Sequence, residues 1–480
     1  MKYETVIGLE VHVELATNSK IFCSCSAHSY GAEPNSHVCP ACCGMPGMLP
    51  IVNKRVVDFG IKAGLMLNCQ INRTTTFDKK SYYYPDLPAA YQTTQWFAPV
   101  AVNGLVEIDT PNGKKGIRIK QIHMEEDAGK LVHDILEDTT HVDFNRTSVP
   151  LIEIVSQPDL SSADEVKAYL ERLKTLLRFA KVAECEMAHG TMRCDVNLSI
   201  RPEGSKEYGV RTEMKNMNSI EAIKRAIEYE TARHIDALER KTEVLVQETR
   251  RWDDIKGKSF AMRSKETAGD YRYFPDPNVM PVVIDDDWFA QMKNSLPELP
   301  EVKRERYMTE LGLSEYDADQ LSKSIALCEC FEDAYSVCGS AKDAANWLIS
   351  EVMSILNVKG MTYDMLNVNG KSLGELIKLV SGGKVGRTNA KKVLLAMFDD
   401  ADVNPEKFAE ENGLIVSNDT GLIEKVVKEA VANDPKAVAD YKGGKEKAIM
   451  SIFGKCMKAL KGNCDPKTLN EILINYINSL

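Results

Sequence analysis

The stretch IGLEVHVEL, residues 7–15, decides how the first part of this chain folds. Its apolar residues alternate with Glu10, His12 and Glu14, which is the two-residue period of a β-strand whose successive side chains leave by opposite faces. The apolar face predicts a strand that covers a hydrophobic core. The opposite face places an imidazole between two carboxylates, so the same strand is also a candidate for a functional site.

The alternation recurs along the chain, and the polar faces share a choice of residues. In MRCDVNLSIR, residues 192–201, one face carries Arg193, Asp195, Asn197, Ser199 and Arg201. In VRTEMKN and HMEEDAGK, the polar residues include Arg211, Glu213, Lys215, His123, Glu125, Glu126 and Asp127. A solvated face of an antiparallel sheet explains each strand taken singly. The residue types favour a site, because Asp, Asn, His and Arg suit fixed hydrogen bonds and metal or phosphate contacts.

A divalent cation explains why acids from separate strands would converge. Glu10, Glu125 and Glu213 can meet only around a positive charge, and Mg²⁺ binds one or two carboxylates together with substrate phosphates. Residues two apart on one strand face are about 6.6–6.8 Å apart, so Glu10 and His12 can reach one ion from either side. Because histidine is an unusual Mg²⁺ ligand, His12 either acts through water or marks a site that also takes Mn²⁺.

A lysine pair lies beside a tyrosine-rich turn in FDKKSYYYPDLPAAYQ, residues 77–92. Lys79 and Lys80 next to aromatic residues suit the phosphates and base of a nucleotide, and an ordinary surface loop is the alternative. The P-loop sequence G-x-x-x-x-G-K-[ST] does not occur, since NVNGKS has Met365 where the leading glycine would be. If ATP binds, it therefore binds by another route.

The cysteine-rich stretch FCSCSAHSYGAEPNSHVCPACCGMPG, residues 22–47, predicts a structural zinc site. Two close thiolate pairs across a short loop are typical of tetrahedral zinc. The predicted ligands are Cys23, Cys25, Cys39 and Cys42. His28 or His37 can replace one cysteine, and reduced thiols without metal are the alternative. A redox role is disfavoured because no thioredoxin-like βαβ pattern surrounds the Cys-x-x-Cys pair.

Composition excludes several classes of protein. With 480 residues, 27% of them charged and 44% hydrophobic, the chain is long enough for about three ordinary folded domains. No run approaches the about 18 apolar residues of a spanning helix, and the start lacks a signal-peptide pattern. Thirteen cysteines without an export signal indicate reduced thiols or metal ligands in the cytoplasm. A net charge of −10 argues against non-specific coating of nucleic acid, although a local basic patch is compatible with it.

Proline content marks the main change along the chain. Of the 19 prolines, only Pro405, Pro435 and Pro466 follow residue 300. The first part shows period-two segments and helical patterns at about 53–67, 162–180 and 217–240, which predicts an α+β fold with a largely antiparallel sheet. From SLPELPEVKRERY onward the period becomes 3.6, and DDADVNPEKF marks a second change. The predicted domains are residues 1–293, an all-helical domain 294–403 and a small helical tail domain 404–480.

The tail has a charge of its own. Residues 442–467 contain seven lysines against Glu446 and Asp465, a local balance of +5. Apolar residues from 448 to 460 fall on one helical stripe, with Lys447, Lys455 and Lys458 off it. A solvated helix face is one interpretation. The other is a patch that follows phosphates, which a net-acidic protein would need in order to hold RNA.

Several long motifs together resemble a known family. They are YETVIGLEVHVEL, KSYYYPDLPAAYQ, IHMEEDAGK, NRTSVPLIEIVSQPD, MRCDVNLSIR, EMKNMNS and MRSKETAGDYRYFPDP. These motifs look like the B subunit of the glutamyl-/aspartyl-tRNA amidotransferase, in order from residue 3 to the C-terminus without large gaps. The resemblance implies a cradle-shaped catalytic domain, a helical domain and a tail that contacts tRNA.

The resemblance also implies a reaction and its partners. Such proteins correct misacylated tRNA, Glu on tRNA(Gln) or Asp on tRNA(Asn), by using ATP and Mg²⁺ to phosphorylate the side-chain carboxylate. Ammonia then displaces the phosphate. It comes from glutamine hydrolysis in a partner amidase, the A subunit, through a channel, and a small C subunit clamps the two into a heterotrimer. A non-catalytic, zinc-stabilised tRNA-binding scaffold is the alternative function.

Site residues follow from the resemblance motif by motif. The family's metal-binding region corresponds to Glu10, His12, Glu125 and Glu213. The motifs that line its phosphorylation site contain Lys79, Arg193 and Asp195, expected to be catalytic, and Ser81, Tyr82, Asn197 and Arg201, expected to bind ATP. The four-cysteine cluster occurs in some members and is replaced in others, so zinc is expected to be optional to the chemistry.

Overall fold

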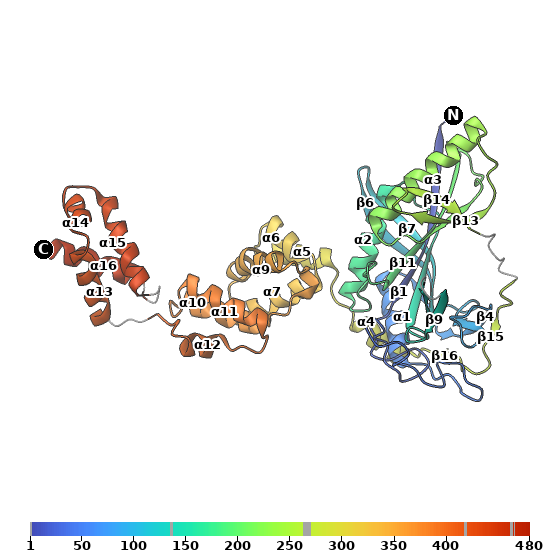
Figure 1. Cartoon of the computed structure of the whole chain (residues 1–480), viewed down its shortest axis with the longest axis horizontal. Helices are drawn as coiled ribbons and strands as arrows, with labels where there is room; N and C mark the ends of the chain where they lie inside the picture. Colours follow the sequence, from blue (N-terminus) through green and yellow to red (C-terminus); the bar gives the residue numbers. More distant parts are fainter. Residues whose placement is uncertain (1, 135–137, 263–269, 417–419, 461–463, 465) are drawn as a thin grey trace. The chain divides into compact units, whose positions relative to one another are not determined.

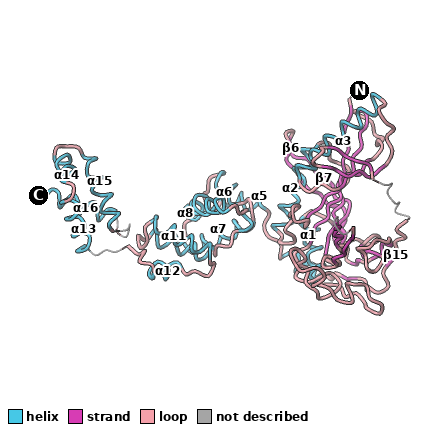
Figure 2. The backbone as a smooth tube through the Cα atoms, viewed as in Figure 1, coloured by secondary structure: helices cyan, strands magenta, loops and turns pink. Residues whose placement is uncertain are grey.

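The computed structural model describes residues 2–134, 138–262, 270–416, 420–460, 464 and 466–480. The chain divides into two compact units, residues 1–297 and 298–480, which are described separately. Among the described residues, β-strands belong to the first unit and the second unit is helical (Figures 1 and 2). The predicted α+β class with helical domains is confirmed. The boundary between the units lies four residues beyond the predicted residue 293.

The first unit is built on a nine-stranded sheet with the strand order β14-β13-β12-β11-β1-β10-β7-β6-β2. The strands are β14 (Lys258–Ala261), β13 (Glu248–Asp253), β12 (Thr212–Lys215), β11 (Met192–Pro202), β1 (Tyr3–Glu14), β10 (Pro150–Ser156), β7 (Gly113–Glu126), β6 (Ala101–Thr110) and β2 (Gln70–Ile71). Every pairing in this order is antiparallel except β12 with β13. The strand predicted from residues 7–15, β1, lies at the centre.

Helices cover the apolar face of this sheet. They are α1 (Lys54–Met66), α2 (Ala163–Phe179) and α3 (Ile220–Arg240), which pack against β7, β6 and β11 respectively (Figure 1). Each begins at a capping residue, Asn53, Ser162 or Ser219, whose side chain accepts a hydrogen bond from a backbone N–H of the first turn. Val11 and Val13 on β1 are fully buried beneath them. The three predicted helices are confirmed.

The opposite face of the sheet carries the polar residues and is bordered by smaller strands. A three-stranded sheet of β15 (Phe274–Pro275), β4 (Asp78–Ser81) and β5 (Tyr91–Thr94) contacts β7 through β5. Two short pairs complete the unit, β3 (Thr74–Thr75) with β16 (Val282–Val283) and β8 (Lys130–Asp134) with β9 (Thr139–Asp143). The helix α4 (Asp286–Asn294) packs against α1. One side of the sheet is therefore core, and the other is left for a site.

The second unit begins with a group of helices. They are α5 (Pro300–Thr309), α6 (Glu315–Leu321), α7 (Ile325–Cys338), α8 (Ala341–Asn346), α9 (Met353–Lys359), α10 (Gly370–Ser381), α11 (Arg387–Asp399) and α12 (Pro405–Glu411). The NGKS sequence is part of the packing here. A Cβ atom on Gly370 or Gly374 would lie 2.6–2.7 Å from a carbonyl oxygen of α7, so these glycines let α10 approach α7 closely.

The tail helices have a hydrophobic core of their own. α13 (Thr420–Ala432), α14 (Pro435–Lys442), α15 (Ile449–Ala459) and α16 (Pro466–Ser479) surround buried residues that include Ile423, Ile452 and Leu473. The predicted stripe is confirmed, because Ile449, Ile452 and Cys456 are buried and Lys447, Lys455 and Lys458 are exposed. Lys461 and Asp465 lie outside the described residues. α12 packs against α10 and α11, and the tail boundary at residue 404 stays a prediction.

None of the described helices is both long and apolar enough to span a bilayer.

Candidate active site and metal centre

The polar face of the sheet opens into a cleft of about 1080 Å³. Strands β1, β7, β10, β11 and β12 contribute its acidic floor, and aromatic residues of the turn after β4 and of the segment before β15 contribute a wall. All four residues predicted to bind the metal line this cleft, although they come from positions 10, 12, 125 and 213 of the chain. The antiparallel register brings them together, since each strand contributes the residues of the same face.

Three side chains on the central strands form a first acidic group, His12, Glu125 and Glu153, with one ligand atom of each within 4.8 Å of the others. The register pairs His12 with Glu153 directly across β1 and β10. The Nε2 atom of His12 lies 3.4 Å from Oε1 of Glu125 and 3.4 Å from Oε2 of Glu153. His123 adds a second imidazole, whose Nε2 is 2.8 Å from Oε2 of Glu153.

In this first group, the histidines and Glu153 each favour the charged form of the other. Burial disfavours the charged form of His12, but the carboxylates of Glu153 and Glu125 outweigh it and raise the pKa of His12 to about 9. Burial likewise opposes ionisation of Glu153, and the two imidazoles hold the pKa of that carboxyl well below its usual value. Glu153 is thus an ionised carboxylate between two histidines, and His12 would give up its proton when its imidazole binds a divalent cation.

A second acidic group lies beside the first on β1, β11 and β12. Glu10, Asp195 and Glu213 each offer a carboxylate oxygen within 4.8 Å of the others. Glu10 and Asp195 face each other directly in the β1–β11 register. Asn197 Nδ2 donates to Oε1 of Glu10 at 3.0 Å, and Thr249 Oγ1 donates to Oε2 of Glu213 at 2.9 Å. These hydrogen bonds fix the orientation of two of the three carboxylates.

The donor atoms of both groups fit a divalent ion. With Mg–O distances of about 2.0–2.1 Å, ligands on opposite sides of the ion are about 4.1 Å apart, so donors within 4.8 Å of one another need only small rotations to bind it. The four predicted metal ligands are divided between the groups, Glu10 and Glu213 in one and His12 and Glu125 in the other. Glu153 completes the first group, and Asp195, expected to be catalytic, completes the second.

The lysine pair of β4 separates, because successive residues of a strand point in opposite directions. Lys80 lines the cleft, with its Nζ 5.6 Å from the ring centre of Tyr82 and 4.9 Å from that of Tyr271. Lys79 is not among the lining residues. Its Nζ lies 3.7 Å from Asp276 Oδ1 and 4.1 Å from the ring centre of Tyr91. The lysine that lines the cleft is thus Lys80, whereas the residue expected to be catalytic is its neighbour Lys79.

The remaining predicted residues lie at different distances from the cleft floor. Tyr82 and Asp195 line the cleft, and Asn197 reaches it through Glu10. The backbone N–H of Ser81 donates to the carbonyl oxygen of Tyr271 at 2.9 Å, which anchors the wall. Arg193 pairs with Asp127 at 2.8 Å and Arg201 with Glu4 at 3.0 Å, and neither guanidinium lines the cleft.

The charged residues that line the cleft without a role in the predicted site include Glu153, Lys120, Arg211 and Lys215. Glu153 is the polar residue between Ile152 and Ile154 in PLIEIVS, and the alternation of this segment was the available signal. Lys120 and Arg211 are exposed and, like Lys80, make no ion pair with any described residue. They add unpaired positive charge to a cleft whose floor is acidic.

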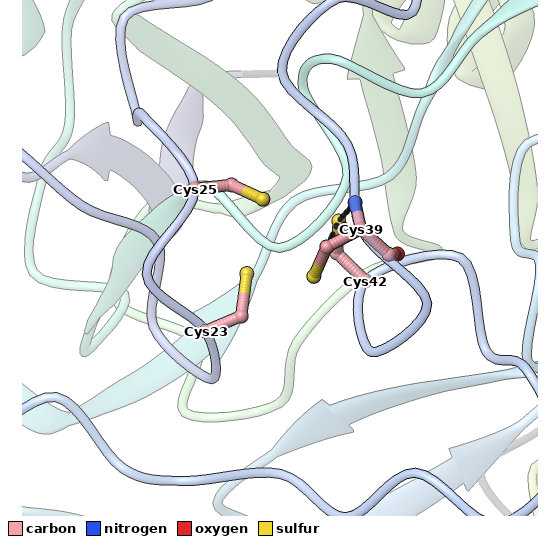
Figure 3. A group of neighbouring side chains, drawn as sticks. All are labelled: Cys23, Cys25, Cys39 and Cys42. Carbon is pink, nitrogen blue, oxygen red and sulfur yellow. Dashed lines mark hydrogen bonds between the residues drawn. The ribbon is translucent and has the colours of Figure 1, made fainter.

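The four predicted cysteines form a separate cluster in the loop after β1 (Figure 3). Their Sγ atoms all lie within 4.8 Å of one another, and those of Cys39 and Cys42 are 3.9 Å apart. Tetrahedral Zn–S bonds of about 2.3 Å place sulfur atoms about 3.8 Å apart, so the cluster has the dimensions of a zinc site. All four thiols are free, and His28 and His37 do not belong to the group.

One sulfur of this cluster favours the thiolate form. A hydrogen bond from the Cys23 thiol outweighs the effect of burial and lowers the pKa of Cys42, helped by the backbone N–H of Cys39 and the Lys20 ammonium. That ammonium lies 3.6 Å from the Cys42 sulfur. Because the thiolate is the form that binds a metal, the cluster is suited to one.

Comparison with known proteins gives one consistent family. Residues 5–290 match the GatB/GatE catalytic domain, and residues 329–477 match the GatB domain. The chain is 51% identical to the B subunit of the aspartyl/glutamyl-tRNA(Asn/Gln) amidotransferase of Caldicellulosiruptor bescii, over 98% of each chain. It is 46% identical to the protein of the same name from Carboxydothermus hydrogenoformans and 45% to that from Clostridium botulinum, over 100% of each chain.

Proposed function

Because this chain belongs to the family of amidotransferase B subunits, which form part of a glutamine-dependent, tRNA-specific ligase, we propose that its cleft is the site of carboxylate activation. ATP phosphorylates the side-chain carboxylate of Glu-tRNA(Gln) or Asp-tRNA(Asn), and ammonia from a partner amidase, the A subunit, then displaces the phosphate. A small C subunit holds the two larger chains together. The products are Gln-tRNA(Gln) or Asn-tRNA(Asn).

The chemistry explains why such a site needs both acids and cations. A carboxylate is a poor acyl donor because its leaving group would be oxide, whereas phosphate leaves readily when ammonia attacks. Bringing a carboxylate to the γ-phosphate of ATP sets like charges together, and that repulsion must be offset. A bound Mg²⁺ supplies this neutralisation, and the donors that would hold it are those of the two acidic groups.

The chain's own cations complete the electrostatics. Lys80, Lys120 and Arg211 line the cleft without an ion pair to any described residue, so their charges are available to phosphate oxygens. The acyl phosphate hydrolyses readily, and a recessed cleft limits its contact with bulk water. The observation that carries the proposal is this one cleft, in which converging carboxylates face unpaired cations. A tRNA-binding scaffold would have no use for that arrangement.

Reconstitution with the partner amidase tests the proposal. We expect the complex to convert Glu-tRNA(Gln) or Asp-tRNA(Asn) to the amide with glutamine and ATP, and to release phosphate in step with product. The isolated chain should show no glutaminase activity, because no motif in its sequence resembles the Ser–Ser–Lys constellation of an amidase. Amidation that proceeds without ATP would contradict carboxylate activation and favour the scaffold function. Glutaminase activity in the isolated chain would contradict the division of labour.

The tail is proposed to hold tRNA. Lys447, Lys458 and Lys467 are exposed and make no ion pair with a described residue, whereas Lys455 pairs with Asp434 at 2.7 Å. Truncation after residue 416 removes α13–α16 and keeps α12 on its partners α10 and α11. We expect the KM for aminoacylated tRNA to rise about tenfold or more, with kcat at saturating tRNA within about twofold.

A charge-only variant separates tRNA contact from loss of the bundle. Replacing Lys447, Lys458 and Lys467 together by glutamine leaves the buried core of the tail intact, and should raise the same KM and weaken its salt dependence. An unchanged KM in both variants would mean that these lysines are only a solvated surface.

A further inference from the structure

A lysine occupies the second acidic group. The Nζ atom of Lys215 contacts the Asp195 carboxylate and lies 3.3 Å from Oε1 of Glu213. Lys215 is the last residue of β12, two positions after Glu213, so both side chains leave by the polar face of the sheet. Two of the three carboxylates that could bind a divalent ion, those of Asp195 and Glu213, therefore already share an ammonium group.

The two acidic groups are neutralised in different ways. In the first, His12 and His123 face Glu153, and an imidazolium that gives up its proton gains a lone pair with which it can itself bind a metal. In the second, the cation is an ammonium, which has three donors and no lone pair for a metal. Burial opposes the charged form of Lys215, but Asp195 and Glu213 raise its pKa, so it stays charged at neutral pH. A divalent ion there would meet a positive charge in contact with its ligands.

The parts of this group also differ in their freedom to move. Asn197 and Thr249 hold Glu10 and Glu213 by hydrogen bonds of 3.0 and 2.9 Å, so these carboxylates are fixed. Lys215 has a four-carbon stem with rotatable bonds, and it is half-buried at the floor of the cleft. When an ion enters, the side chain that can leave is the lysine.

We propose that Lys215 is the resident counter-cation of the Glu10–Asp195–Glu213 group, holding the carboxylates together without a divalent ion and leaving when one binds. This inference rests on the proposed function, since it concerns the ion used there. It makes Lys215 a positioning residue. The displaced ammonium remains beside the cleft, where it can donate hydrogen bonds to the phosphate oxygens of ATP. Ion and nucleotide are then expected to promote each other's binding.

Titration of the full chain with Mn²⁺, followed by electron paramagnetic resonance, tests the displacement. Lys215→Met removes the competing charge and is expected to tighten Mn²⁺ binding at least tenfold in the absence of nucleotide. It should also abolish most of the gain in Mn²⁺ affinity that ATP gives the wild type. Lys215→Arg keeps the charge and should bind Mn²⁺ as weakly as the wild type. Lys224→Met is the matched control, because Lys224 pairs with the exposed Asp164 at 2.7 Å.

A second measurement needs no variant and so does not depend on how a variant folds. Acylation of lysines in the wild-type chain, quantified by mass spectrometry, should modify Lys215 several-fold faster with saturating Mn²⁺ than with chelator. Lys224 should be modified equally in both. Unchanged or slower modification of Lys215 with Mn²⁺ would overturn the displacement.

The outcomes distinguish the inference from the proposed function. Mn²⁺ binding by the wild type that Lys215→Met leaves unchanged or weakens would overturn the role of Lys215 and leave the proposed metal intact. A wild-type chain and a Lys215→Met chain that both bind no Mn²⁺ would count against the metal of the proposed function itself.

Discussion

Replacing Glu125 by glutamine is expected to abolish ATP-dependent amidation while the affinity for tRNA stays within a few-fold. Glu125 is 2% exposed, and its two oxygens reach in different directions. Oε1 lies 3.4 Å from Nε2 of His12, and Oε2 accepts a hydrogen bond from Thr94 Oγ1 at 3.3 Å. Glutamine keeps the volume and can still accept from Thr94. It removes the negative charge that a divalent ion in the first acidic group requires.

The expected loss is at least about 100-fold in kcat, since the ion supplies much of the charge stabilisation for phosphoryl transfer. Single-turnover amidation with ammonium chloride and ATP, measured in the reconstituted complex, isolates this step from glutamine hydrolysis. Filter binding gives the tRNA affinity separately. Glu107→Gln is a matched control, because Glu107 lies on β6 and makes only a 3.7 Å contact with the exposed Lys114. Normal turnover in Glu125→Gln would remove Glu125 from the metal's ligands.

Zinc removal is expected to have the second large effect, on stability and not directly on chemistry. Chain purified without chelator should contain one zinc per molecule, and Cys42→Ser should contain none. The residues from 16 to 52 form no helix or strand longer than a single bridge, so the sulfur cluster is a main crosslink within this loop. Structural zinc contributes about 10–16 kcal/mol of apparent binding free energy in zinc-finger peptides. We therefore expect the first unit to lose several kcal/mol of unfolding free energy.

Cys43→Ser provides the control for this prediction. Cys43 is the next residue along the chain, yet it is not one of the four sulfurs that converge. The Cys43→Ser variant should retain zinc and unfold at the wild-type temperature in calorimetry. Metal analysis that finds little zinc in the wild type, with all four thiols titratable, would show that the cluster is a set of reduced cysteines.

The sequence was most informative where one face of an element is buried. The alternation in residues 7–15 and 192–201 predicted two central strands and which side chains share a face, because burial on one side imposes the period. The same reasoning predicted α1, α2, α3 and the stripe of α15. The cysteine spacing predicted which four sulfurs converge, because two close pairs across one loop leave little freedom.

The sequence was less informative where a site depends on which strands are neighbours. Strand order is set by long-range pairing, and β10, which lies between β1 and β7, was not among the predicted strands. Because this strand was not predicted, Glu153, which pairs with His12 across β1 and β10, was not identified as a site residue. Likewise Lys79 and Lys80 are equivalent by composition, and only the pairing of β4 with β5 and β15 decides which of them faces the cleft.

The sequence by itself determined the α+β class, the strand faces that carry the acids, the four-cysteine cluster and, through its motifs, the family. Only the tertiary structure decided that the acids form two groups, that Glu153 joins His12 and Glu125, and that Lys215 lies among Glu10, Asp195 and Glu213. The physical reason is that periodicity is a local property imposed by burial, whereas the meeting of side chains depends on strand order and register. Contacts between residues far apart in the chain set both.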